Sequence, residues 1–186
     1  ALQSWLPFTW HVIFRRKPAI YSIHDVYPDV GVQLGIFQNE TVTRIVAGLE
    51  GFCANHARIV RILSDSFRPG VHALGVENAK IAIIYDWVDT DLIRPIPKEN
   101  SFSREHSLND QFVILYAGNI GLSQGLEHIL TTAEILADHK DLRFVFVGDG
   151  TGRELLQTQA QQRHLPNTLF VNFQPRERLP EVLASA

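Results

Sequence analysis

The stretch FVILYAGNIGLSQGLEHIL, residues 112–130, decides the fold of the second half of the chain. It opens with an apolar run, as in a buried strand, and closes with apolar residues at helical spacing. Between the two stand Gly118, Gly121 and Gly125, which let the backbone approach a ligand closely. A helix that starts near Gln124 would present free N–H groups and its positive dipole end to an anion. The pattern predicts a strand, a phosphate-type loop and a helix; an ordinary tight turn is the alternative.

The same alternation of a short apolar run with an amphipathic helix recurs further along the chain. After residue 130 it appears twice more, with apolar runs at residues 142–148 and 168–173. This order is typical of βαβ units, so we predict an α/β fold whose parallel sheet is buried on both faces. In the first half we predict a helix over residues 39–57 and a short one that Gly75 closes. Strands are predicted there at residues 19–25, 58–64 and 80–86.

A polar stretch separates the two halves. RPIPKENSFSREHSLND, residues 94–110, carries two prolines and many charges and has no hydrophobic period. We therefore predict a linker over residues 93–110 between an N-terminal domain, residues 1–92, and a C-terminal domain, residues 111–186. The chain has no Met and stops within a helical pattern, so we expect both domains to be truncated.

A second glycine loop, VGDGTGRELL at residues 147–156, again joins a predicted strand to a helix. Gly148, Asp149 and Gly150 are its candidate ligand contacts. A nicotinamide site is disfavoured, because Arg153 stands where a glycine is needed and the next strand ends in Asn and Gln rather than in an acid.

Two polar residues, His24 and Asp25, end the first predicted strand, where open α/β sheets place their ligands. An imidazole there can orient a hydroxyl or transfer a proton, so both are candidate catalytic residues. The alternative is a His that only caps the strand. Cys53 and His56 lie inside a predicted helix without a second pair, so we expect no metal site and a buried, inert Cys53.

The overall composition limits the possible partners. The chain has 186 residues with a net charge of −3, which does not favour nucleic acid, and one Cys, which fits a reducing compartment. Apolar runs are too short to span a bilayer. Near the start, aromatic residues from Trp5 onward precede Arg15, Arg16 and Lys17. That segment suits peripheral contact with a membrane surface, or an ordinary amphipathic helix on a core.

Taken in order, these motifs resemble the GT-B retaining glycosyltransferases of family four. The similarity is greatest to the subgroup that builds capsule, exopolysaccharide and O-antigen sugars. SIHDVYPDVGVQLG (22–35) resembles the family's strand-end His segment, and KIAIIYDWVDTDLIRP (80–95) resembles the segment that ends its N-terminal domain. LYAGNIGLSQGLEHIL (115–130) and the chain from residue 144 to its end resemble the strand–loop–helix units of the donor domain.

The resemblance implies two Rossmann-like parallel-sheet domains that face a cleft. Residues 1–92 would form the second half of the acceptor-side domain, and residues 111–186 the first half of the nucleotide-sugar-binding domain. The activity implied is transfer of a sugar, with retention and without a metal or other cofactor, from a UDP- or GDP-linked donor. The acceptor would be lipid-linked or a saccharide, and the location cytoplasmic, with peripheral contact at the inner face of the plasma membrane.

Site residues carry over by position. Gly118, Asn119 and Gly121 would lie against the donor diphosphate, and His24 would match the acceptor-side His. The candidate donor set is Gly118, Asn119, Gly121, Gln124, Gly148, Asp149 and Gly150, with Phe173, Gln174 and Pro175 at the base.

One departure from the family pattern concerns charge. Many relatives carry Arg or Lys in the first loop, where this chain has Leu122, Ser123 and Gln124. A cation there neutralises the departing diphosphate, so we expect this stretch alone to bind donor weakly and to be inactive. Two alternatives stay open: a GT-B sugar-nucleotide epimerase, and a non-catalytic, degenerate domain that serves as an assembly module.

Overall fold

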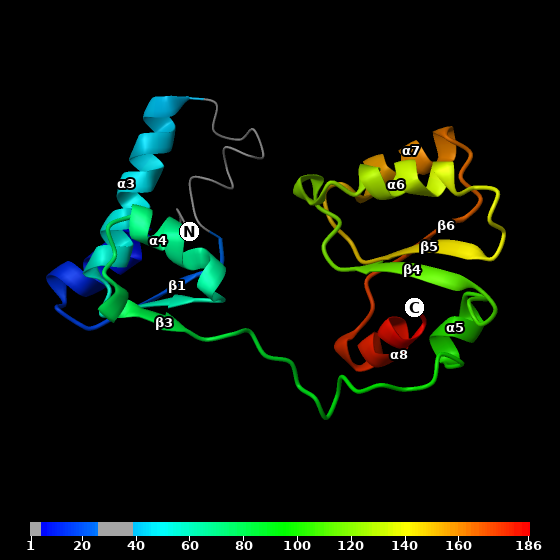
Figure 1. Ribbon diagram of the computed structural model, residues 1–186, viewed down its shortest axis with the longest axis horizontal. Helices are drawn as coiled ribbons and strands as arrows, with labels where there is room; N and C mark the ends of the chain where they lie inside the picture. Colours follow the sequence, from blue (N-terminus) through cyan, green and yellow to red (C-terminus); the bar gives the residue numbers. More distant parts are fainter. Residues whose placement is uncertain (1–4, 26–38) are drawn as a thin grey trace. The chain divides into compact units, whose positions relative to one another are not determined.

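The computed structural model describes residues 5–25 and 39–186, so most of the segment at residues 22–35 lies outside the described part. The chain divides into two compact units, Ala1–Trp87 and Val88–Ala186, and each is described by itself (Figure 1). Short 3₁₀ or π turns carry the letter η. The described elements of the first unit are α1 (Trp5–Thr9), η2 (Trp10–Phe14), β1 (Ile20–Ile23), α3 (Glu40–His56), β2 (Ile59–Ile62), η3 (Asp65–Phe67), α4 (Arg68–Ala73), η4 (Asn78–Lys80) and β3 (Ile81–Ile83). Those of the second unit are α5 (Ser101–Glu105), β4 (Phe112–Ala117), η5 (Leu122–Gln124), α6 (Glu127–Ile135), β5 (Leu142–Val147), α7 (Arg153–Gln162), β6 (Thr168–Val171), η6 (Arg176–Arg178) and α8 (Leu179–Ala184).

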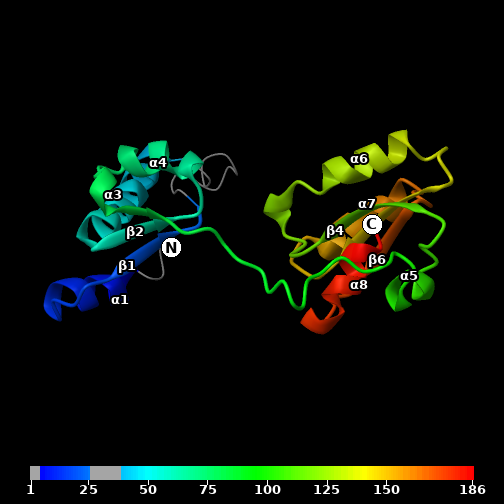
Figure 2. The same cartoon turned by 60° about the horizontal axis from the view of Figure 1, so that its bottom comes forward.

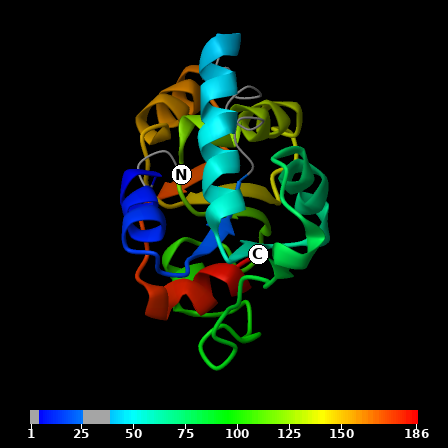
Figure 3. The same cartoon turned by 90° about the vertical axis from the view of Figure 1, so that its left-hand side faces the viewer.

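The described part of the first unit is built on a parallel sheet with the strand order β1-β2-β3. The predicted helix over residues 39–57 is α3, which runs unbroken (Figure 3). Asn39 caps it, since its side chain accepts a hydrogen bond from the Thr41 N–H at 2.8 Å. Helices α3 and α4 cover one side of the sheet, against the fully buried Val60 and Ile62 of β2 (Figure 2). Gly75 follows α4 with a φ of +82°, in the left-handed conformation that the sequence predicted.

Two titratable groups lie on the buried face of α3. Cys53 is 2% exposed, and burial raises the pKa of its thiol to about 11, so it packs as a small hydrophobic side chain, as predicted. Glu50 is 6% exposed. Burial raises the pKa of its carboxyl group, and a hydrogen bond with Tyr21 only partly opposes that shift. The ionised form of Glu50 therefore destabilises the first unit.

The Glu50 carboxyl makes the stability of the first unit depend on pH. A raised folded-state pKa means that the contribution of this group is complete below its unfolded-state pKa and is lost as the pH rises through the folded-state pKa. We expect Glu50→Gln to stabilise the first unit at about pH 7 and to match the wild type near pH 4. Urea unfolding followed by tryptophan fluorescence measures this, because Trp5, Trp10 and Trp87 all lie in this unit.

Glu77→Gln is the matched control, since Glu77 is exposed and its carboxyl group is already in water. Equal effects of the two substitutions at both pH values would contradict the prediction.

The second unit, described throughout, has a parallel sheet with the order β4-β5-β6. Side chains alternate along β5. Phe144 and Phe146 pack into the core beneath α6 and α7, while Val145 and Val147 pack into the core beneath α5 and α8. Figure 1 shows these two helix pairs on opposite faces of the sheet. The predicted α/β class, with a parallel sheet buried on both faces, is confirmed here.

The structure differs from the predicted linker over residues 93–110. Helix α5 lies inside that stretch, and the side chains of Phe102 and Leu108 are fully buried. Asn100 caps α5 by accepting from the Ser103 N–H at 3.0 Å, and it donates to the Glu181 carbonyl of α8 at 3.1 Å. The stretch resembles a linker in sequence because its few apolar residues do not recur at a helical or strand period. It is instead part of the second unit.

The described part of the N-terminal segment forms α1 and η2. Phe8 packs edge-on against Tyr21, with 5.5 Å between the ring centroids. Four other apolar side chains are exposed, Leu6, Trp10, Ile13 and Phe14, whereas Trp5 and Val12 are partly buried. Among residues 5–25 and 39–186, no helix has both the length and the apolar character that a membrane span requires.

Candidate functional site

Three loops leave the sheet of the second unit at the same edge. The parallel register pairs Ala117 with Val147 and Val147 with Val171, so β4, β5 and β6 end together. The ladder continues one residue further, because the Gly118 N–H donates to Val147 at 2.9 Å and the Gly148 N–H donates to Val171 at 3.1 Å. This is the carboxyl edge, where parallel α/β sheets bind ligands.

The first loop rests directly on the second. Ile120 anchors the first loop in the core, and its N–H donates to the Asp149 carbonyl at 2.8 Å. Gly148 and Gly150 have φ values of +143° and +153°. A Cβ at Gly148 would lie 1.9 Å from the Gly118 carbonyl oxygen, and one at Gly150 would lie 2.4 Å from that of Ile120. Glycine is required at both positions, because two backbones meet there.

A pocket of about 500 Å³ opens at this edge. It is lined by Ala117, Gly118, Asn119, Val147, Gly148, Asp149, Phe173, Gln174, Arg176 and Leu179. Six of the predicted donor residues are in this set, whereas Gly121, Gln124, Gly150 and Pro175 are not. That any of them contacts a donor stays a prediction. Another pocket, of about 430 Å³, lies along α7 and the start of β6, away from the carboxyl ends of the strands.

The helix after the first loop starts later than predicted. The sequence places its start near Gln124, but that residue ends the 3₁₀ turn η5. Gly125 follows with a φ of +62°, and α6 begins only at Glu127. The left-handed Gly125 interrupts the helical path, which apolar spacing alone does not reveal. The first loop is therefore longer than expected, and Tyr116 braces it by donating to the Asn119 carbonyl at 2.7 Å.

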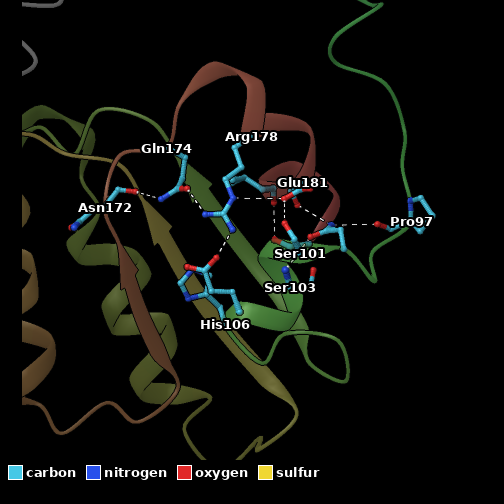
Figure 4. Close-up of polar contacts among 12 residues, drawn as sticks. Pro97, Ser101, Ser103, His106, Asn172, Gln174, Arg178 and Glu181 are labelled. Atoms are coloured by element: carbon cyan, nitrogen blue, oxygen red, sulfur yellow. Dashed lines mark hydrogen bonds and ion pairs between the residues drawn. The ribbon is translucent and has the colours of Figure 1, made fainter.

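Arginines fix two parts of the pocket wall. Arg153 donates to the carbonyl oxygens of Gly148 and, at 3.1 Å, Val171, which ties the second loop to the end of β6. Arg178 donates to the Gln174 side chain at 3.2 Å and also pairs with Glu105 and Glu181, as Figure 4 shows. The hydrogen bond from Arg178 holds the pKa of Glu105 below its usual range. Arg178 thus holds the predicted base-contacting turn through Gln174, and carboxylates of α5 and α8 hold Arg178 in place.

Arg176 is the one charged residue among the four lining residues that the sequence did not predict; the other three, Ala117, Val147 and Leu179, are apolar. Arg176 is the first residue of η6 and directly follows Pro175. In sequence it lies two strands after the first glycine loop, the loop in which many relatives carry Arg or Lys. Its side chain is 67% exposed, and Nη2 lies 3.6 Å from the Asp89 carboxylate. Its position directly after the predicted base-contacting turn, residues 173–175, is the sequence feature that could have identified it as a pocket residue.

His24 and Asp25 lie in the first unit, exposed at the end of β1 as predicted. His24 Nε2 is 3.3 Å from the Ser22 hydroxyl, which accepts a hydrogen bond from Arg61 at 3.1 Å. Arg61 also pairs with Asp86 at 2.6 Å. His24 therefore contacts a polar network of Ser22, Arg61 and Asp86, and the simple strand cap stays the alternative. Its catalytic role, and that of Asp25, stays a prediction.

Comparison with known proteins agrees with this architecture. Residues 97–186 match the family described as Glycosyl transferases group 1. The solved structure of Anabaena Alr3699/HepE in complex with UDP and glucose has a TM-score of 0.75 at 20% identity, over 100% of this chain and 49% of that one. WaaG, a glycosyltransferase involved in lipopolysaccharide biosynthesis, has a TM-score of 0.67 at 17% identity, over 91% of this chain and 49% of its own. The fold is that of the GT-B glycosyltransferases, with Rossmann-like domains.

Two curated relatives are similar in sequence. The Escherichia coli K12 protein named as colanic acid biosynthesis glycosyl transferase WcaI is 45% identical over 170 residues, 88% of this chain and 42% of its own length. The Pseudomonas aeruginosa protein named as glycosyltransferase WbjE is 24% identical over 133 residues, 70% of this chain and 33% of its own. The chain therefore spans less than half the length of either relative.

Proposed function

We propose that the protein is a retaining glycosyltransferase of family four that acts in cell-surface polysaccharide synthesis. It would move a sugar from a nucleotide-sugar donor to a lipid-linked or saccharide acceptor, without a metal ion. The observation that carries the proposal is the pocket at the carboxyl edge of β4, β5 and β6, lined by two glycine loops and the turn after β6. The 45% identity to WcaI, a protein named for colanic acid biosynthesis, supports the polysaccharide context.

The chemistry of the pocket suits a nucleoside diphosphate linked to a sugar. The backbone at Gly118 is open, since a Cβ there would meet only the Tyr116 ring, at 3.6 Å or more. The N–H groups of Gly118 and Ile120 are used within the fold, so the phosphate oxygens would be met by the remaining peptide N–H groups of this loop. Phe173 is 73% exposed beside the pocket and offers an aromatic face to a base. HepE, which shares the fold, has been solved with UDP-glucose, which favours a UDP-linked donor.

The two alternatives receive less support. Both curated relatives are named as glycosyltransferases, which favours glycosyl transfer over epimerisation of a sugar nucleotide. A non-catalytic assembly module would not need an open pocket at the carboxyl edge of the sheet. We further propose a cytoplasmic location with peripheral membrane contact through the exposed apolar side chains of α1 and η2 and the adjacent Arg15, Arg16 and Lys17. Co-sedimentation with phosphatidylglycerol vesicles measures that contact.

The donor site is tested by Gly118→Ala. The added methyl group fits the fold, but it adds bulk where the backbone lines the pocket. We expect UDP to bind at least about tenfold more weakly, a loss of about 1.4 kcal/mol of binding free energy, while the unfolding midpoint is unchanged. Titration of UDP into the isotope-labelled chain, followed by NMR with and without EDTA, measures both the affinity and any metal requirement.

Gly48→Ala is the matched control, because a Cβ at Gly48, in α3 of the first unit, meets nothing within 4 Å. Equal UDP affinity in the wild type and both variants, or shifts confined to residues outside the pocket, would contradict the proposed site.

A further inference from the structure

The pocket at the carboxyl edge of β4, β5 and β6 has a single source of positive side-chain charge. Within residues 88–186, all of them described, Arg176 is the only basic residue in the pocket lining. The same lining contains the exposed carboxylate of Asp149, whose Oδ1 accepts only the neighbouring Gly150 N–H at 2.8 Å. Without Arg176, the side chains of the pocket would carry a net negative charge and repel an anionic ligand.

Arg176 differs from the two other arginines near the pocket. The guanidinium of Arg178 is held by two carboxylates and by Gln174 (Figure 4). It also lies 5.6 Å from the Phe102 ring centroid. Arg153 is committed to two backbone carbonyls. Arg176 has one ionic partner, Asp89, at 3.6 Å, and both side chains are largely exposed. Such a surface pair contributes little and is readily exchanged for another anion.

We propose that Arg176 binds the diphosphate of the nucleotide sugar and that Asp89 occupies its guanidinium until the donor arrives. This deepens the proposed function and rests on it. A guanidinium has five N–H donors in a planar fork that matches two phosphate oxygens, and a diphosphate carries more charge than one carboxylate. The donor therefore displaces Asp89. The cation missing from the first loop is supplied by the turn after β6.

Substitution of Arg176 tests the proposal with two probes, UDP and uridine. We expect Arg176→Gln to weaken UDP binding at least about tenfold and to flatten its dependence on salt, because one charge-assisted contact is lost. Binding of uridine, which has no phosphate, should be unchanged. Arg163→Gln is the control: Arg163 pairs with Glu134 at 3.5 Å, is not part of the pocket lining, and should leave both ligands unaffected.

Asp89→Asn tests the competing carboxylate. Asp89 Oδ1 accepts the N–H groups of Asp91 and Leu92 at 3.1 and 3.2 Å, and Asn keeps that acceptor while removing the charge. We expect Asp89→Asn to tighten UDP binding by about twofold to fivefold in the wild type and to have no effect in Arg176→Gln. This non-additivity is the measure of a direct interaction.

The outcomes separate the inference from the proposed function. If Arg176→Gln weakens uridine as much as UDP, Arg176 supports the base or the turn, and the inference is wrong. If UDP binding is unchanged in Arg176→Gln but lost in Gly118→Ala, the donor site stands and the inference falls. If the wild-type chain shows no NMR response in pocket residues at any UDP concentration, both are overturned.

Discussion

Gly148→Ala is expected to unfold or severely loosen the second unit. The residue has a φ of +143°, which L-residues avoid, and its Cβ would lie 1.9 Å from the Gly118 carbonyl oxygen. Relief requires two backbones to separate, since no flexible side chain can yield. We expect a loss of about 3 kcal/mol or more, the sum of backbone strain and broken hydrogen bonds between the two loops. UDP binding should fall with it.

Hydrogen exchange measured by mass spectrometry shows which of the two units Gly148→Ala destabilises. Peptides from residues 88–186 should lose protection in Gly148→Ala, while those from the described part of the first unit keep it. Gly48→Ala is the reference substitution, and in a helix interior it should stabilise by up to about 1 kcal/mol. Wild-type protection in residues 112–150 of Gly148→Ala would mean that the two loops do not pack as described.

Phe102→Ala is expected to destabilise the second unit by a similar amount. The side chain is fully buried between α8 and the sheet, although it lies in the stretch whose composition suggests a linker. Removing a buried phenylalanine ring costs about 3–5 kcal/mol, because apolar contacts are lost and a cavity remains. Arg178 would also lose the ring beneath its guanidinium, which loosens the hold on Gln174.

Phe112→Ala supplies the matched comparison, because Phe112 is 66% exposed at the start of β4. It should cost under about 1 kcal/mol. Chemical unfolding followed by circular dichroism compares the stability of the two variants. Hydrogen exchange then shows which unit has lost protection. Equal and small effects would indicate that residues 101–108 are a linker after all.

Local patterns predicted the elements of this fold well. Each strand of the second unit is a mostly apolar run of four to six residues, and each is followed by helical spacing. The parallel register follows from that order, so the sequence also located the carboxyl edge and most of the pocket residues. The start of α6 was predicted too early, because left-handed Gly125 interrupts a pattern that apolar spacing treats as continuous.

The sequence by itself determined the order of the strands and of the helices that alternate with them, the α/β class and the glycine loops, because these depend on neighbours within one turn or one strand. Only the tertiary structure decided why Gly148 must be glycine, that α5 belongs to the second unit and that Arg176 reaches the pocket. Each of these depends on contact between segments distant along the chain, such as Gly118 with Gly148 and Asp89 with Arg176. Such contacts produce no periodic pattern of apolar residues in the sequence around them. They arise only when the parallel strands bring the three loops to one edge.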